Sequence, residues 1–220
     1  KSQKRIQNLA IQNNQSYQVF YNGLGNSGTV GQYSILLDIS PTGFGTGYST
    51  TSGPGSLITS NLVWNSTWRH ITLTYDNGIL THYTNGLPTA TDTIGTLIVG
   101  SNFETKIGVG VNSSQYFNGF IDDFTIWNTV ALNQQEILDY MDCSPIGNEI
   151  GLLAYLNFET GSGTTAYDQT VNGNDGIING ATYSANAPTQ SCNLTNANGC
   201  DSAAILNLTI NYSTVDTDTV

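Results

Sequence analysis

Two Asn-Gly pairs, at 77–78 and 85–86, divide residues 68–94 into three short runs rich in β-branched and aromatic residues. An Asn-Gly pair between two such runs favours a type I′ turn, in which both central residues take positive φ and the flanking strands pair. This stretch therefore predicts a three-strand antiparallel meander. Residues 70–75 alternate polar with apolar side chains, so one face of the first strand is predicted to be core, and the other to meet water or a neighbouring element.

Strand-like runs bounded by Gly, Asn and Ser continue through most of the chain. They cover residues 16–23, 32–40, 117–127, 152–158, 176–181 and 204–210. Residues 42–56 are rich in Gly, Ser and Thr and are predicted to be a loop. One helix is predicted near residue 133, because Asn133 and Glu136 have capping-box spacing and Ile137, Leu138 and Met141 form an apolar edge. The sequence thus predicts an all-β antiparallel β-sandwich with one short helix and a short β tail.

The charge balance disfavours two classes of partner. Five basic and 16 acidic residues give a formal net charge of −11, which repels nucleic-acid phosphates and anionic membrane surfaces. No apolar run approaches the roughly 18 residues of a membrane-spanning helix. A surface that is polar but poor in charge is typical of extracellular proteins, so we expect a secreted or cell-surface location.

Three cysteines, Cys143, Cys192 and Cys200, lack the paired spacing of a zinc site. In an extracellular protein one disulfide is expected, and Cys143 with Cys192 is the favoured pair because these residues flank the stretch 151–184. Closing that loop would stabilise the fold by roughly 3–4 kcal/mol. A local pair, Cys192 with Cys200, is the alternative.

Three motifs together resemble the laminin-G-like, concanavalin A-like lectin jelly-roll domain. They are WRHITLTYDNGILTHYTNG, YFNGFIDDFTIWNTVALNQQEI and GLLAYLNFETGSGTTAYDQTVNGNDGIINGATYS. The resemblance implies a jelly-roll sandwich and covers well over half of the chain. The chain end, TNANGCDSAAILNLTIN, resembles a Cys-containing repeat of long secreted surface adhesins of Bacteroidetes, which implies that this chain is part of a longer multidomain protein.

The order of the motifs differs from that of the family, because the opening strands come last. We interpret this as circular permutation: residues 151–184 complete the sandwich beside residues 120–127, and residues 1–190 form one domain whose own opening is missing. Residues 191–220 would then begin an adhesin-type β repeat or a linker. The alternative is that residue 151 begins a second copy of the domain, although a lone hairpin would be marginally stable.

A calcium site is predicted from oxygen-bearing side chains, because Ca²⁺ prefers six to eight hard oxygen ligands. The proposed ligands are Asp168, Asn172, Asn174 and Asp175 of one loop and Asp122 of the neighbouring strand. Members of the resembled family often hold a structural calcium near such positions. The alternative is that Asp168 and Asn172 only shape turns through bonds to the backbone.

Exposed aromatic residues that could contact a glycan are Tyr48 and Trp64, whereas Trp68 and Trp127 match packing positions of the family. Catalytic members of this fold carry a Glu-x-Asp-x-x-Glu strand, which the sequence lacks, so no enzyme activity is expected. The sequence predicts a non-catalytic adhesion or carbohydrate-binding module that binds a glycan or cell-surface polysaccharide. A structural spacer in a long adhesin is the alternative, and a glycoside hydrolase is disfavoured.

Overall fold

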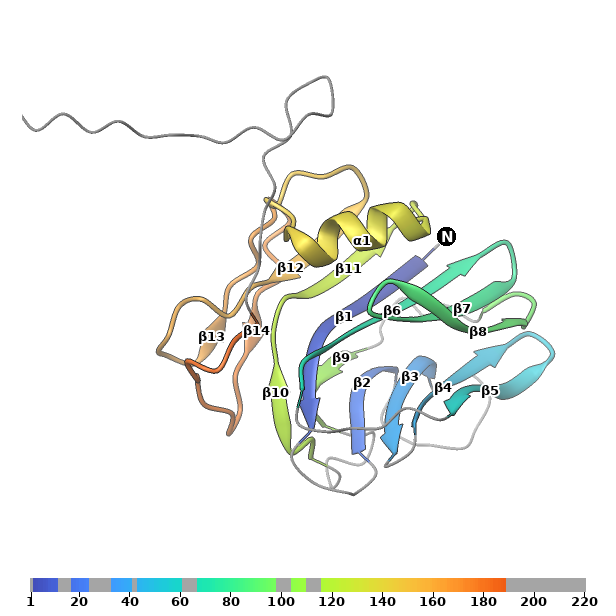
Figure 1. Ribbon diagram of the computed structural model, residues 1–220, viewed down its shortest axis with the longest axis horizontal. Coiled ribbons are helices and arrows are strands. Elements are labelled where there is room, and N and C mark those ends of the chain that lie inside the picture. The colour runs from blue at the N-terminus through green and yellow to red at the C-terminus, as the bar shows by residue number, and fades with distance from the viewer. Residues whose placement is uncertain are drawn as a thin grey trace, which may run out of the picture.

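The computed structural model describes residues 2–11, 17–23, 33–40, 43–60, 67–97, 104–109 and 116–188. Two β-sheets face each other, and one helix lies against the first of them (Figure 1). All strand pairs among the described residues are antiparallel. The predicted antiparallel β-sandwich with one short helix is therefore confirmed.

The first sheet has the order β12-β11-β1-β6-β7-β8, with β10 also paired to β1. Its strands are β1 (Ser2–Ile11), β6 (Arg69–Asp76), β7 (Ile79–Thr84), β8 (Leu87–Thr93), β10 (Gly119–Ile121), β11 (Phe124–Asn128) and β12 (Leu152–Leu156). The second sheet has the order β5-β4-β3-β2-β9. Its strands are β2 (Tyr17–Gly23), β3 (Tyr33–Ser40), β4 (Gly43–Thr50), β5 (Gly53–Ser60) and β9 (Glu104–Ile107).

The predicted meander forms strands β6, β7 and β8. Asn77 and Asn85 each have φ of 49°, and the glycine after each also has positive φ, as a type I′ turn requires. Both faces of β6 are mostly buried. The opposite sheet covers one face, and the other face therefore does not meet water either.

The main core lies between the two sheets. Leu37, Ile39 and Phe44 of the second sheet and Ile71 and Phe124 of the first are at most 1% exposed. Burial of each such side chain contributes roughly 1.5–3 kcal/mol to folding. This core holds the two sheets face to face.

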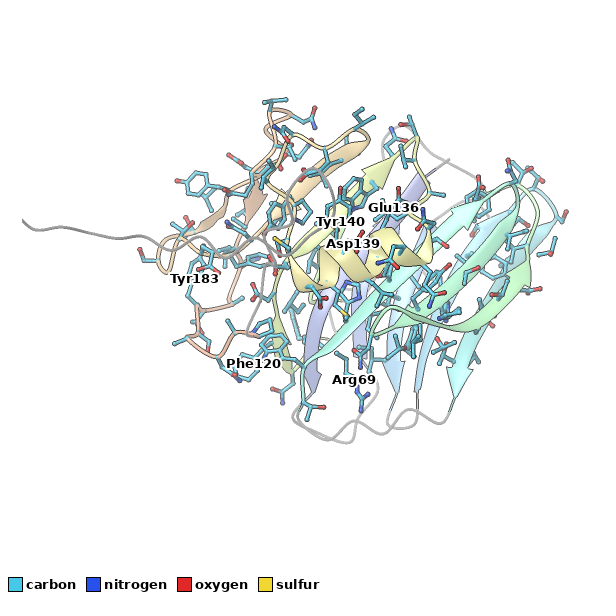
Figure 2. All side chains as sticks on the ribbon, turned by 45° about the horizontal axis from the view of Figure 1, so that its top comes forward. Arg69, Phe120, Glu136, Asp139, Tyr140 and Tyr183 are labelled. Atoms are coloured by element: carbon cyan, nitrogen blue, oxygen red, sulfur yellow. The ribbon has the colours of Figure 1, made fainter. Side chains whose placement is uncertain are left out.

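Helix α1 (Gln134–Asp142) covers the outer face of the first sheet. Asn133 and Glu136 form both bonds of the predicted capping box. Ile137 is fully buried in a second core with Trp127, and the ring of Tyr140 lies 5.0 Å from that of Trp127. Figure 2 shows Tyr140 on the helix. Trp127, at 1% exposure, is therefore the core residue that the sequence predicts.

The late strand β12 pairs with β11, with Leu156 opposite Phe124 and Leu152 opposite Trp127. The first sheet is thus extended within the same molecule by residues beyond the helix, while circular permutation and the domain bounds 1–190 and 191–220 stay predictions. The next predicted strand, near residues 176–181, is shorter than expected. Only β14 (Gly176–Ile177) forms there, and it pairs with β13 (Thr165–Ala166) as a separate two-stranded sheet.

The cysteine pairing and the β tail fall largely outside the described residues. Cys143 ends helix α1 and is disulfide-bonded, but Cys192, Cys200 and residues 191–220 are not described. The Cys143–Cys192 pair therefore stays a prediction. No helix of the described part has the length and apolar character needed to cross a membrane.

Candidate functional site

Strand β4 alternates glycine with core residues, in the sequence GFGTGYST. Phe44, Thr46 and Tyr48 are buried, so the period-2 alternation of a strand places the glycines on the outer face of the second sheet. Gly45 and Gly47 are partly exposed there. Glycine weakens a strand interior and often marks a position that a ligand or another backbone approaches closely.

The neighbouring edge strand, β5, provides one wall beside these glycines. Its exposed positions are Pro54, Ser56 and Ile58, and Gly47 pairs with Ser56 while Gly45 pairs with Ile58. Ile58 is 65% exposed. We call Gly45, Gly47, Pro54, Ser56 and Ile58 together the glycine lane. Helix α1 lies on the other sheet (Figure 1), so among the described elements no helix covers the lane.

Sequence reasoning missed the lane, because residues 42–56 were expected to form a loop. The structure instead has strand β4 and the first half of β5 in this region. The signal was present in the strict alternation of glycine with Phe44, Thr46 and Tyr48. The low apolar content of residues 42–56 favoured a loop over this alternation. However, a strand with only one buried face needs few apolar residues.

Tyr48 is not the exposed aromatic that the sequence suggested, and this prediction is wrong. It is 8% exposed, its ring packs on Gly55 of β5, and its hydroxyl donates to Asp92 of β8 at 3.5 Å. The ring fits because position 55 has no side chain. Trp64, the other predicted aromatic, lies outside the described residues.

Trp68 was expected in the core but is only half-buried. Its ring lies 6.1 Å from that of Phe120 at an angle of 48°, and Figure 2 labels Phe120 away from helix α1. Trp68 directly precedes β6, so the alternation of that strand does not direct it into the sandwich.

The predicted calcium loop is held together by its own hydrogen bonds. The Asp168 carboxylate accepts the backbone N–H groups of Tyr155, Thr170 and Asn174 at 2.8–3.0 Å, and the Thr170 hydroxyl at 2.8 Å. Burial alone would raise the pKa of Asp168, but these donors outweigh it and hold the pKa below its ordinary value. Donors that converge on both carboxylate oxygens occupy the positions that a cation would need.

The two asparagines of the loop also face backbone groups. The Asn172 and Asn174 side-chain amides donate to the Leu153 carbonyl at 3.0 and 2.8 Å, and Asp175 accepts the Asp168 N–H at 2.8 Å. The two amide bonds satisfy the Leu153 carbonyl on the free edge of β12, and a covered edge strand is protected from pairing with another chain. The arrangement fits the turn-shaping alternative.

Asp122 lies apart from this loop. Strand β12 stands between them, because Leu156 pairs with Phe124 on one side and bridges to Asp168 on the other. The five predicted ligands are therefore not brought together. Among the described residues no three Asp, Glu, His or Cys side chains are grouped to hold a metal ion, so the predicted set does not fit calcium as arranged.

A positive φ of 49° at Asp123 explains the position of Asp122. It interrupts the predicted alternation from Phe120 to Ile126, so that Asp123, at 4% exposure, is the buried carboxylate of the pair. Asp122 is half-buried, and its pKa is raised to about 7 by burial and by Asp123, with Glu159 adding to the effect.

Asp122→Asn is expected to stabilise the protein at alkaline pH. Between about pH 4 and pH 7 the native state keeps a proton that the unfolded state releases, so stability falls as pH rises through this range. Asparagine removes the charge and keeps an acceptor for the Asp123 N–H, which now bonds Asp122 at 3.0 Å. Thermal melts should show a gain in Tm at pH 8 that shrinks toward pH 4.

The same variant tests the calcium prediction. If Asp122 binds calcium, the metal should raise the Tm of the wild type at pH 8, and Asp122→Asn should remove that gain. A wild-type Tm that is equal in chelator and in excess calcium would reject the site. A lower Tm for Asp122→Asn in metal-free buffer would contradict the electrostatic argument.

Comparison with known proteins identifies the fold family. The family model described as the concanavalin A-like lectin/glucanases superfamily matches residues 9–138, which is more than half of the chain. No curated protein sequence matches significantly.

Solved structures share the fold at low sequence identity. A Bacteroides ovatus protein whose carbohydrate-binding role is itself only proposed has a TM-score of 0.56 and 17% identity over 87% of this chain. The sialidase carbohydrate-binding module CBM40 of Ruminococcus gnavus, bound to α2,3-sialyllactose, has a TM-score of 0.54 and 16% identity, covering 64% of this chain and 83% of its own. A pentraxin from Limulus polyphemus gives 0.51 and 16%, with 71% and 79% covered. The match spans 62% of the Bacteroides protein.

Proposed function

Because the chain belongs to the concanavalin A-like lectin/glucanase superfamily, we propose that it is a non-catalytic carbohydrate-binding domain whose glycan lies on the glycine lane. The observation that carries the proposal is the pair of partly exposed glycines, Gly45 and Gly47, on an inner strand of a sheet face that no helix covers in the described part of the chain. Glycine costs stability in such a strand, and removal of two side chains there leaves room for a ligand to approach the backbone.

The chemistry of the lane suits a sugar. Ile58 offers an aliphatic surface to the C–H groups of a sugar ring, and Ser56 offers a hydroxyl as donor and acceptor. The carbohydrate-binding role of two structural neighbours agrees with this use of the fold, although the fold alone does not set the function.

The carboxylates of the second sheet support a non-catalytic role. Its five strands contain two, Asp38 in β3 and Glu104 in β9. They pair with Gln18 and Gly23, at opposite ends of β2, which places their backbones about 16 Å apart along the strand direction. Glycoside hydrolysis uses two carboxyl groups about 5–10 Å apart across the scissile bond.

Gly45→Val tests the proposal directly. A Cβ at Gly45 would meet Ile58 Cγ1 and the Leu57 carbonyl oxygen at 3.7 Å, which is ordinary contact, and valine favours strands. We therefore expect the variant to fold with a stability close to that of the wild type. The new methyl groups fill the lane, and binding to the glycans that the wild type selects on an array should fall about tenfold or more.

Gly176→Ala is the matched control. Its Cβ would also meet only ordinary contacts, with Ala166 at 3.6 Å, but it lies in β14 rather than in the second sheet. Binding by this variant should equal that of the wild type. Full affinity in a folded Gly45→Val variant would place the glycan elsewhere, and a wild type that binds no glycan would reject the function.

A structural spacer in a longer secreted or cell-surface protein is the alternative. It is favoured by exposed apolar residues beyond helix α1, since Ile150, Val171 and Ile177 are each at least 89% exposed. Such residues suit contact with other parts of a multidomain chain. A wild type without any glycan signal would favour this role.

A further inference from the structure

We propose that residues 206–212 of this chain cover an apolar surface beside β12, to which the disulfide of Cys143 tethers them. We call this surface the apolar patch. Its residues are Ile146, Ile150, Leu153 and Val171. The inference is independent of glycan binding. It is carried by the exposure of the patch, by the closed edge of β12, by the residue pattern of 206–212 and by the tether.

The most exposed large apolar side chains lie beyond helix α1. Among the described residues, those before the helix are at most 65% exposed, whereas Ile146, Ile150 and Val171 are 79%, 89% and 96% exposed. This part of the chain lies with β12 at the opposite edge of the first sheet from β8 (Figure 1). Monomeric domains rarely leave several apolar side chains bare in one region, so we expect an occupant.

The apolar patch comes from two chain segments that contact each other. A Cβ on Gly147 would meet the backbone of Gln169, so the segment with the first patch residue runs beside the segment with the last. The Asn172 side-chain amide donates to the Leu153 carbonyl at 3.0 Å, which joins the same two segments a second time. The patch residues therefore belong to one continuous part of the surface.

The edge of β12 beside the patch is closed to a further strand. The Leu153 carbonyl already accepts two asparagine side chains. The Tyr155 N–H donates to Asp168 at 2.9 Å, and the Tyr155 carbonyl accepts the Gln169 N–H at 2.8 Å. An occupant cannot extend the first sheet through these groups, so it contacts the patch through apolar side chains.

Residues 206–212 have the pattern of a strand with one apolar face. The apolar residues alternate with Asn207, Thr209 and Asn211, and they are Leu206, Leu208, Ile210 and Tyr212. In an extended chain this alternation places the apolar side chains on one face. Even an isolated two-stranded hairpin is only marginally stable in water, so a single strand of this kind needs an apolar partner surface.

The disulfide keeps this segment close to the patch. Cys143 is disulfide-bonded, and the other cysteines of the chain, Cys192 and Cys200, precede Leu206 by 14 and 6 residues. Either pairing therefore holds Leu206 about 12–22 Å from Cys143. Ile146 follows Cys143 by three residues and lies within about 11 Å of it. A tether of this length gives a millimolar effective concentration, so a weak apolar contact is sufficient.

Amide hydrogen exchange of the whole chain with its disulfide intact tests the contact. We expect the amides of residues 206–212 to exchange about tenfold or more slowly than those of an unprotected chain. Val171→Asp and Leu208→Asp each place a charge in the contact and should remove this protection. Exchange of these amides at the unprotected rate in the wild type would overturn the proposal.

Leu87→Asp and Thr209→Asp are the matched controls. Leu87 is also an exposed apolar residue, at 59%, but lies in β8, and Thr209 alternates with the apolar residues. Both controls should keep the protection, and protection of β6 should show that every variant is folded. A loss in either control would contradict the contact. Protection that survives Val171→Asp would place the segment elsewhere, and protection that depends on protein concentration would assign the patch to a second copy; either result overturns the proposal.

Discussion

Asp123→Ala is expected to lower the free energy of unfolding by about 3–5 kcal/mol, which is a large share of the stability of a domain of this size. The Asp123 carboxylate accepts the Tyr155 hydroxyl at 2.7 Å and the Ser144 hydroxyl at 2.9 Å. These bonds join the β10–β11 junction to β12 and to the segment after helix α1. Alanine would leave both hydroxyls without this acceptor, and its side chain is disfavoured at a φ of 49°.

Denaturant unfolding measures this loss, and Asp123→Asn is its control. Asparagine tolerates positive φ and keeps one acceptor oxygen, so it should cost clearly less than alanine. Tyr155→Phe removes one of the two bonds and should cost an intermediate amount. A double-mutant cycle between positions 123 and 155 should show coupling. A cost below about 1 kcal/mol for Asp123→Ala would refute the role of this carboxylate.

His82 is expected to make the protein sensitive to acid. It is fully buried between the sheets, with Nδ1 3.0 Å from the Thr59 hydroxyl and its ring stacked 4.6 Å from that of Phe44. Burial lowers the pKa of His82 to about 3. Below about pH 6.5 the unfolded state binds a proton that the native state excludes until about pH 3. The free energy of unfolding should therefore decrease as the pH is lowered from about 6.5 to about 3, by up to about 1.4 kcal/mol per pH unit.

His82→Phe isolates this contribution. Phenylalanine retains an aromatic ring against Phe44 and cannot titrate, so the acid-dependent slope between about pH 6.5 and pH 3 should become shallower. The slope that remains in acid comes from carboxylates such as Asp168, whose pKa lies below its ordinary value. The comparison belongs in an Asp122→Asn background, because Asp122 acts with the opposite sign between about pH 4 and pH 7. Denaturant unfolding over this pH range gives the slopes. Equal slopes with and without His82 would show that the buried ring does not set the acid sensitivity.

Local chemistry was enough to predict several elements. The Asn-Gly pairs specify the meander because their residues adopt the positive φ of a type I′ turn at low cost. Asn133 and Glu136 specify the start of helix α1 because each satisfies a backbone N–H of its first turn. The pairing of β12 with β11 followed from motif order, since the family places these strands side by side.

The candidate site could not be located in the same way. Tyr48 and Gly47 are adjacent in the sequence, yet one is in the core and the other on the lane. Similarly, Asp122 and Asp123 exchange their expected positions because one residue with positive φ shifts the alternation.

The sequence by itself determined the turns, the helix cap and the class of fold, because these depend on the intrinsic preferences of a few neighbouring residues. Only the tertiary structure decided which face of β4 is exposed, which of Asp122 and Asp123 is buried, and which backbone groups the Asp168 loop hydrogen-bonds. Those outcomes depend on strands far apart in the chain. A shift of one residue in their register moves every side chain to the opposite face.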